Sequence, residues 1–184
     1  YADVRNRMSE QHTRWINEMN DLGFIPEETI DSLRGDRSLY ETVREQNIPM
    51  DEIRETAMMA TNNPDGNIDE LASRLSHEDP SVRFWAATAF SVTNQQPDDV
   101  REELLNRRND SSPAVRVAVG EALYRFGEQK QALEVFQKAL DAEHAYIKLR
   151  ALNTINALDI RNLPSSMVTK IRSLRDSRDE RGGT

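Results

Sequence analysis

The residues best suited to chemistry in this sequence are its three histidines, because imidazole serves both as a general base and as a metal ligand. His12, His77 and His144 lie far apart in the chain. None has a second histidine or a clustered carboxylate at the spacing of a metal motif such as HExxH. His77 and His144 each stand just before a segment with helical periodicity, where a loop role is expected. The histidines therefore predict neither a catalytic site nor a metal site.

Paired carboxylates are the second candidates, since general acid–base catalysis uses two acids in different environments. Asp98 and Asp99 are followed by Glu102 and Glu103. All four come after Pro97, in the first two turns of an expected helix, where negative charge complements the helix dipole. Stabilisation of a helix start on a solvated face is the better explanation, and we predict no catalytic residue in this chain.

The string TNNPDGNIDELA, residues 61–72, weakly resembles a calcium-binding loop when Gly66 is set at the sixth position. The first and twelfth positions would then be Thr61 and Ala72, and neither supplies the carboxylate that such a loop requires. The Pro-Asp-Gly sequence instead predicts a turn. We therefore predict no metal ligand and no cofactor in this chain.

A repeated pattern describes the elements that would position any functional residue. DPSVRFWAATAF, residues 79–90, recurs as SPAVRVAVGEAL, residues 112–123, and more weakly as AYIKLRALNTINAL, residues 145–158. Within each copy the apolar residues recur at helical spacing and form one stripe. Each copy also follows another amphipathic segment, and these segments begin at Asn67, Pro97 and Gly127. The repeating unit is therefore predicted to be a hairpin of two helices.

The starts of the first two copies carry the signals of helix N-termini. Pro80 and Pro113 suit the first helical turn, where the missing N–H group costs nothing. Asp79 and Ser112, which precede them, are suitable N-caps.

The fold class follows from the repetition. One hairpin cannot bury its apolar stripe alone, and stacking several hairpins forms a continuous core. We therefore predict an all-α fold, a right-handed α–α superhelix of about four short helical hairpins. A degenerate earlier hairpin is expected from residues 37–46 and 49–61, and a last helix from Leu163.

Composition restricts the possible partners. The 184 residues include 32 acidic and 24 basic side chains, for a net charge of −8, and no cysteine. Nucleic acid is an unsuitable partner because phosphate binding needs a positive surface. No apolar run is long enough to cross a membrane. The absence of cysteine excludes disulfides and thiolate metal sites and leaves the compartment open.

The pattern V-R-x-x-A-x-x-A-L with a preceding D-P resembles the second helix of HEAT-type repeats. In that family the arginine, here Arg83 and Arg116, typically meets an acidic residue in the turn, and Asp79 and Asp110 are the expected partners. The copies recur about every 33 residues, which is shorter than the roughly 40–47 of standard HEAT units and indicates a compact variety. The tetratricopeptide repeat is the alternative, because ALYRFGEQKQALEVFQKAL resembles one such unit.

The N-terminal part resembles a segment near the carboxyl end of a group of bacterial sulfatases, arylsulfatase-like members of the alkaline-phosphatase superfamily. There a W-x(4–5)-D-x-G-F-x-P-E run precedes an R-S-x-Y-[DE] element, and short HEAT-like repeats follow. The stretch HTRWINEMNDLGFIPEETIDSLRGDRSLYE, residues 12–41, carries this order. The matching residues are Trp15, Asp21, Gly23, Phe24, Pro26, Glu27, Arg37, Ser38, Tyr40 and 79–86.

The resemblance implies a parent enzyme that hydrolyses sulfate esters with calcium and a formylglycine made from a C/S-x-P-x-R motif. None of that chemistry transfers to this chain. The nearest string, SSPAVR, places Val115 where the motif needs arginine, and Arg116 comes one residue late. The chain is therefore expected to be a noncatalytic C-terminal region, and the parent to be exported or periplasmic.

Three parts of the chain are expected under this interpretation. Residues 1–35 would link to a missing upstream catalytic domain, residues 36–176 would form the HEAT-like solenoid, and residues 177–184 would form a charged, flexible tail. The sequence begins at Tyr1 without an initiator Met, which agrees with a portion of a longer protein.

The function predicted is mechanical. The repeats would pack on the parent's own catalytic domain, on another subunit or on a long polymeric substrate. The alternative is a free-standing HEAT or tetratricopeptide interaction scaffold. Adjacent Phe84 and Trp85 point about 100° apart on a helix, so one ring would face the next repeat and the other a second layer or a partner. The candidate interaction surface comprises Trp15, Phe24, Phe84, Thr88, Val117, Glu121, Lys148 and Leu152.

Overall fold

The computed structural model of the chain describes residues 1–19, 21–34, 38, 41–42 and 48–179. Within these residues the regular elements are all helices, and no strand occurs among them. The all-α prediction is therefore confirmed. No helix in this part of the chain is long and apolar enough to cross a membrane.

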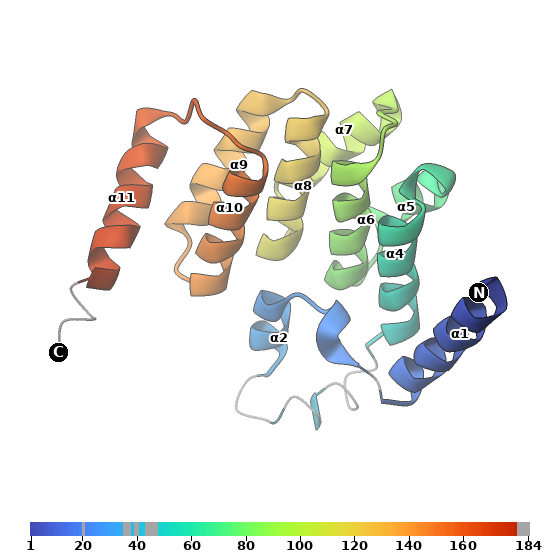
Figure 1. The fold of residues 1–184 in the computed structure, drawn as a ribbon. Helices are drawn as coiled ribbons and strands as arrows, with labels where there is room; N and C mark the ends of the chain where they lie inside the picture. Colours follow the sequence, from blue (N-terminus) through green and yellow to red (C-terminus); the bar gives the residue numbers. More distant parts are fainter. Residues whose placement is uncertain (20, 35–37, 39–40, 43–47, 180–184) are drawn as a thin grey trace.

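The repeats form a row of paired helices that runs from one side of the molecule to the other (Figure 1). Each predicted second helix appears where its pattern placed it, and so do the first helices predicted from Asn67, Pro97 and Gly127. In chain order these helices are α4 (Met50–Asn62), α5 (Ile68–Arg74), α6 (Pro80–Val92), α7 (Asp98–Arg107), α8 (Pro113–Arg125), α9 (Gln129–Asp141), α10 (Ala145–Ala157) and α11 (Ser165–Asp179).

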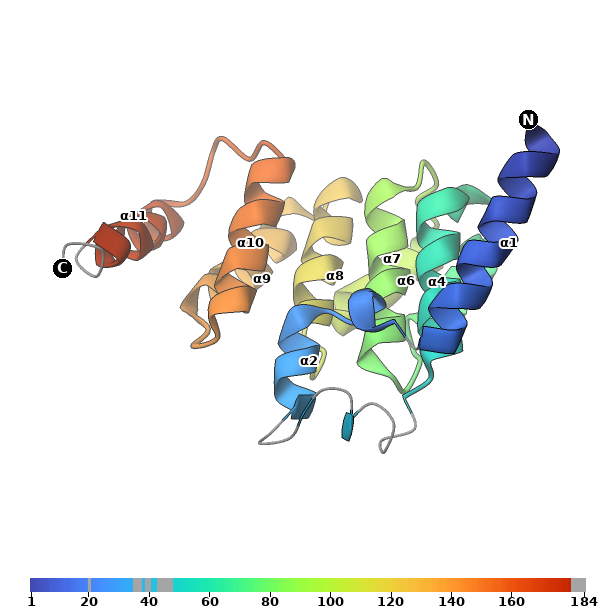
Figure 2. The same cartoon turned by 60° about the horizontal axis from the view of Figure 1, so that its bottom comes forward.

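The stack has two layers. Helices α4, α6, α8 and α10 pack side by side, and we call them the second-helix layer. Helices α5, α7 and α9 cover one side of this layer, and α11 packs against α9 (Figures 1 and 2). The degenerate hairpin expected before α5 is described only in its second half, α4, because most of residues 37–46 lie outside the described residues. Likewise, residues 180–184 of the predicted tail are outside them.

The repeated apolar stripe forms the core. Val82, Ala86, Val119 and Leu123 each have 0% of their surface exposed. Together with their equivalents they belong to one hydrophobic cluster that continues to Met167 on α11, apart from Val82, which packs with Ile25 and Ile53. Full burial of a valine or leucine side chain is worth about 1.5–3 kcal/mol. The repetition therefore serves packing between neighbouring hairpins.

The helix starts use the predicted caps. The Asp79 carboxylate accepts a hydrogen bond from the Ser81 N–H at 2.7 Å, and the Ser112 hydroxyl accepts one from the Val115 N–H at 3.5 Å. At the other end of α8, Gly127 has a φ of 82°, a left-handed conformation that glycine adopts without strain.

The Pro-Asp-Gly turn between α4 and α5 is also confirmed. Pro64–Gly66 forms a short 3₁₀ turn, η2. The Asp65 carboxylate accepts hydrogen bonds from the Thr93 hydroxyl and from the backbone and side chain of Asn94 in the next inter-repeat loop. These hydrogen bonds lower the pKa of Asp65. The string that weakly resembled a calcium loop thus joins two repeats.

The predicted partners of the repeat arginines are wrong. The Arg83 guanidinium binds Asp110 of the following repeat through two hydrogen bonds of 2.8 Å, while Asp79 is occupied in capping α6. Arg116 donates to the backbone carbonyls of Asp110 and Ser111. The third copy has Ala142 at the position of Asp110, which explains why Arg116 lacks the corresponding carboxylate.

The Arg83–Asp110 pair is buried, with 8% and 2% of the two side chains exposed. Burial raises the pKa of the Asp110 carboxyl, but hydrogen bonds from Arg83 and from the Ser112 N–H, with the charges of Arg83 and Arg107, outweigh it. The net effect lowers the pKa below its ordinary value. The pair therefore joins the α5–α6 hairpin to the turn between α7 and α8.

The N-terminal part lies outside the regular stack. Helix α1 (Ala2–Met19) leads into a 3₁₀ turn, η1 (Leu22–Phe24), and then α2 (Glu27–Arg34). Figure 2 shows η1 and α2 crossing in front of the second-helix layer. Residues 22–34, which we call the strap, bring a segment from the chain start against the four helices of the second-helix layer.

Candidate functional site

The structure places the predicted interaction residues in very different surroundings. Trp15 is 55% exposed on α1, whereas Phe84 is 9% and Val117 is 1% exposed. Val117 therefore offers almost no surface in this structure. The others are half-buried, and they are Phe24, Thr88, Glu121, Lys148 and Leu152.

The strap contacts the adjacent aromatic residues of α6 through Trp85. The Trp85 indole N–H donates a 2.7 Å hydrogen bond to the Phe24 carbonyl. The Phe84 and Trp85 rings meet edge to face, with centroids 5.4 Å apart. Ile25 on the strap is 4% exposed and packs in a small cluster with Val82. The second layer that we expected one of these rings to meet is therefore the N-terminal segment of the same chain.

Arg150 on α10 is the second anchor of the strap. Its guanidinium pairs with the Glu28 carboxylate, with one N–O distance of 3.0 Å, and lies 3.3 Å from a Glu27 oxygen. The same guanidinium stands over the Phe84 ring, 4.8 Å from its centroid. Glu28 is 6% exposed, so its charge is buried against Arg150.

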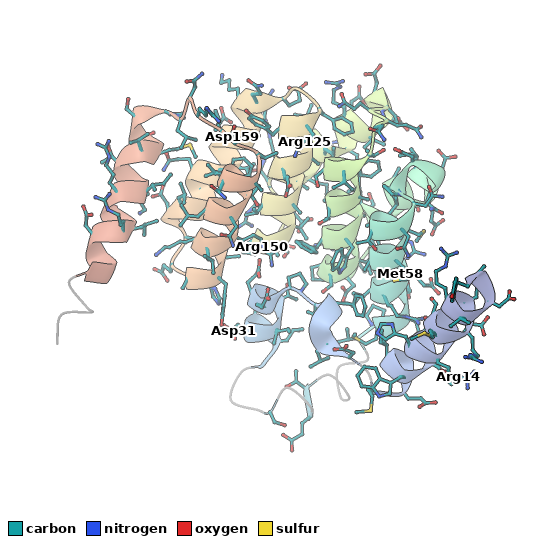
Figure 3. All side chains as sticks on the ribbon, viewed as in Figure 1. Arg14, Asp31, Met58, Arg125, Arg150 and Asp159 are labelled. Atoms are coloured by element: carbon teal, nitrogen blue, oxygen red, sulfur yellow. The ribbon has the colours of Figure 1, made fainter. Side chains whose placement is uncertain are left out.

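A third contact continues this charge pattern. His144, which precedes α10, lies 3.3 Å from an Asp31 oxygen on α2. The labelled Arg150 and Asp31 lie where α10 and α2 approach each other (Figure 3). Acidic side chains of the strap thus face basic side chains of the stack.

A pocket of about 410 Å³ opens beside the strap, between α2, α8 and α10. Tyr146 and Leu149 on its wall are 46% and 51% exposed. Burial raises the pKa of the Glu121 carboxyl above its ordinary value, and the charges of Arg125 and Arg150 only partly oppose this effect. The lining consists of Glu27, Glu28, Glu121, Tyr146, Leu149, Arg150, Asn153, Thr154 and Ala157.

The geometry suits recognition by charge and apolar contact. Glu27 and Glu28 are occupied by Arg150. In the part of the chain that the structure describes, no group of three His, Asp or Glu side chains is arranged to hold a metal ion. The pocket can receive an apolar or cationic side chain beside Tyr146, Leu149 and the Glu121 carboxylate.

The histidines occupy unrelated places. His77 lies 2.9 Å from a Glu52 oxygen, and its other ring nitrogen accepts a hydrogen bond from the Asp79 N–H. His12 stacks on Trp15, with ring centroids 6.4 Å apart. The His77 contacts join α4 to the turn before α6.

Sequence reasoning missed Arg150, Tyr146 and Leu149. Glu28 and Arg150 are 122 positions apart in the chain, so no local pattern connects them. The one available signal was the acidic pair Glu27–Glu28 at the start of a helix, whose partner the sequence does not identify.

Comparison with protein families matches residues 68–156 to HEAT repeats. The matched stretch runs from the start of α5 to the last turn of α10. The comparisons with curated proteins and with solved structures found no match. The match, the two-layer packing and the recurring buried stripe agree, and residues 68–156 thus form a HEAT-like repeat region.

Proposed function

We propose that the chain is a noncatalytic scaffold that binds protein through its second-helix layer. The observation that carries this proposal is the pocket between α2, α8 and α10, which has two exposed apolar side chains, Tyr146 and Leu149, next to the half-buried Glu121. Aromatic and apolar side chains grouped around a concavity are typical of binding surfaces on otherwise polar proteins. HEAT repeats, which match this region, support a scaffold role.

Site-specific photo-crosslinking tests the scaffold function. A photoreactive phenylalanine at position 146 in the full chain should crosslink a discrete protein partner in cells of the source organism. Adding Leu149→Asp should remove that adduct, because it places a charge on the apolar wall. The same photoreactive residue at exposed position 161 is the matched control. Equal crosslinking from positions 146 and 161, or an adduct insensitive to Leu149→Asp, would count against the proposal.

For the identity of the partner, we keep both predicted alternatives. In the first, the chain is the C-terminal region of a sulfatase, and Trp15 on α1 and the repeats pack on an upstream catalytic domain that uses calcium and formylglycine. The comparisons offer no support for a sulfatase parent, so this origin stays a prediction. In the second, the chain is a free-standing interaction scaffold, and the HEAT-repeat match is compatible with it.

The coding region upstream of Tyr1 separates these alternatives. The sulfatase interpretation requires a C/S-x-P-x-R motif there, a link through residues 1–35 to that domain, and measurable binding between the upstream domain and residues 1–184 expressed separately. Titration calorimetry with the two pieces should give saturable heat, and Trp15→Ala should weaken it. If no such motif precedes Tyr1, the first alternative fails and the free-standing scaffold stands. The division into residues 36–176 and 177–184, and export of the parent, are proposals of the same kind.

A further inference from the structure

The strap contacts four successive second helices, α4, α6, α8 and α10, without being part of their hairpins. Ile25 packs with Val82 of α6, Glu28 pairs with Arg150 of α10, and α2 also packs on α8. Regular hairpins share apolar walls with both neighbours, whereas the strap lies across one face of the layer (Figure 2). Its arrangement is that of a ligand segment lying on a groove.

The chemistry of the strap and of the face beneath it is complementary. An apolar part, Leu22, Phe24 and Ile25, is followed by Pro26 and the two acids that open α2. The apolar part lies on Val82 and Trp85, and the acids lie on Arg150. The carboxylates also favour the helix start electrostatically. A short segment with this pattern therefore contains both the acids that favour a helix start and the apolar and acidic side chains that contact the stack.

The bonds that hold the strap suit exchange between occupants. On the stack, the polar contacts with the strap come from the Trp85 indole, from Arg150 and from His144. On the strap, their partners are one backbone carbonyl and three carboxylates, namely those of Phe24, Glu27, Glu28 and Asp31. Another chain with the same sequence pattern can supply each of these acceptors. A tethered segment competes with a free one at an effective concentration of about millimolar, so the resident strap masks the groove from weak ligands.

We propose that the face of α4, α6, α8 and α10 under the strap is a docking groove for an acidic segment of a partner protein. The segment that fits it has aliphatic or aromatic residues followed by a proline and by two acids at a helix start. Residues 22–34 are its resident, intramolecular occupant. The inference rests on the proposed scaffold function and names the class of partner, which gains access when the strap leaves.

A peptide exchange experiment tests the groove directly. The probe is a fluorescent peptide of residues 21–34, DLGFIPEETIDSLR, titrated by anisotropy into the full chain. Ile25→Ser with Glu28→Ala weakens the strap but leaves Arg150, Trp85 and Val82 unchanged. This double variant should bind the peptide at least about 10-fold more tightly than the unaltered chain, because the tethered competitor is weakened. Equal affinity for the two chains, or no binding to the folded double variant at millimolar peptide, overturns the proposal.

A charge exchange identifies the anchor. In the Ile25→Ser/Glu28→Ala background, Arg150→Glu should weaken peptide binding at least about 10-fold, the scale of one lost desolvated ion pair. A peptide with lysine in place of Glu27 and Glu28 should regain affinity for the Arg150→Glu chain and lose it for the Arg150 chain. Unchanged affinity in both combinations would show that the peptide binds elsewhere and would sink the assignment. Circular dichroism and urea unfolding establish that each variant is folded.

Locking the strap provides a test that does not depend on weakening it. The chain has no cysteine, so Asp31→Cys with His144→Cys can be joined by a short, reducible bifunctional crosslinker. The crosslinked chain should bind the peptide at least about 10-fold more weakly than the same chain after reduction, because covalent closure raises the effective concentration of the strap further. Asp159→Cys with Arg161→Cys, an exposed pair away from the strap, is the control, and its reduction should change nothing. Identical binding before and after reduction of the Asp31–His144 link contradicts the proposal.

The two sets of experiments fail independently. Peptide exchange measures binding to the groove in the absence of a partner protein. Photo-crosslinking at position 146 detects a partner protein in the absence of the peptide. A discrete crosslink together with failed peptide exchange would leave the scaffold function intact and end the strap inference. Peptide exchange without a crosslinked partner would support a groove under the strap and would count against the scaffold function proposed for the pocket beside it.

Discussion

At the scale of single residues, the Arg83–Asp110 pair shows how one repeat is fastened to the next. Its two hydrogen bonds of 2.8 Å join the start of α6 to the turn before α8, and Arg83 also donates to the His77 and Glu78 carbonyls. A buried ion pair adds little over apolar packing, but removing one partner leaves the other charge buried and unpaired. The pair is therefore sensitive to single substitutions.

The first prediction follows from this burial. Arg83→Ala should reduce the free energy of unfolding by about 3–5 kcal/mol, since the Asp110 carboxylate loses its guanidinium. Urea unfolding followed by circular dichroism measures it. The double variant Arg83→Ala/Asp110→Ala should lose clearly less than the sum of the two single losses. Arg161→Ala breaks an exposed pair with Asp159 and should cost at most about 1 kcal/mol. Similar losses for Arg83→Ala and Arg161→Ala would refute this view of the buried pair.

The second prediction concerns Glu121. Its folded pKa is raised because burial disfavours the charged carboxylate, so the protonated form contributes stability at acid pH. That contribution is lost as the pH rises from the ordinary pKa through the raised one. The variant Glu121→Gln carries a side chain that is neutral at every pH. Near neutral pH it should therefore unfold at a higher temperature than the unaltered chain. Near pH 4, close to the ordinary carboxyl pKa of about 4.3, the two chains should unfold at similar temperatures.

Thermal unfolding across this range measures the difference between the two chains. Glu102→Gln changes an exposed carboxylate on α7 and serves as the control. A Glu121→Gln chain that is less stable than the unaltered chain at neutral pH would contradict the assigned cause of the shift.

At the scale of helices, close approach between α8 and α9 depends on a glycine. A Cβ atom added to Gly120 would lie 2.9 Å from Phe136 Cε1 and 3.0 Å from Val135 Cγ1 on α9. Alanine normally stabilises a helix interior by about 1 kcal/mol relative to glycine. Here the neighbouring side chains occupy the space that the methyl group needs.

The third prediction is that Gly120→Ala destabilises the chain despite this intrinsic gain. Overpacking of a well-filled core costs about 1–3 kcal/mol, which outweighs the helix propensity. Chemical unfolding gives the magnitude, and Val135→Ala, which opens part of the space, should make the double variant lose less than the sum of the single losses. A net gain in stability from Gly120→Ala would show that α9 moves away freely.

The helices also show what the sequence could predict. Capping residues and apolar periodicity lie within a few positions of each other, so α5 to α10 and the caps Asp79 and Ser112 follow from local patterns. The partner of Arg83 and the position of the strap depend on contacts between distant segments. Trp85 and Phe24 are separated by 61 positions, and only the assembled stack brings them together. The predicted surface residues consequently included Val117, whose side chain the packing buries.

At the scale of the whole molecule, stability is distributed along the row. In stacked repeats each unit contacts only its neighbours, so the loss from a substitution depends on its place in the row. Leu123 in α8 is 0% exposed and has hairpins on both sides. Ile171 in α11 is only half-buried and packs at the last described helix of the row.

The fourth prediction compares these two positions. Leu123→Ala should cost about 2–5 kcal/mol and raise amide hydrogen exchange throughout α6 to α10, because the middle of the stack supports both directions. Ile171→Ala should raise exchange mainly in α11. Hydrogen exchange with mass spectrometry resolves the two patterns. Uniform acceleration over the whole chain in both variants would mean that the row unfolds as one unit.

The hydrogen bond from the Trp85 indole to the Phe24 carbonyl has an optical consequence. The protein has two tryptophans, and they differ in solvent access, since Trp15 is largely in water. A Trp15→Phe chain would keep a single tryptophan, Trp85, which is hydrogen-bonded to the N-terminal segment of the same chain. Indole emission moves to longer wavelength when water replaces a protein neighbour. The emission maximum of Trp85 should therefore report, without any added label, whether the N-terminal segment is bound to the stack or released from it.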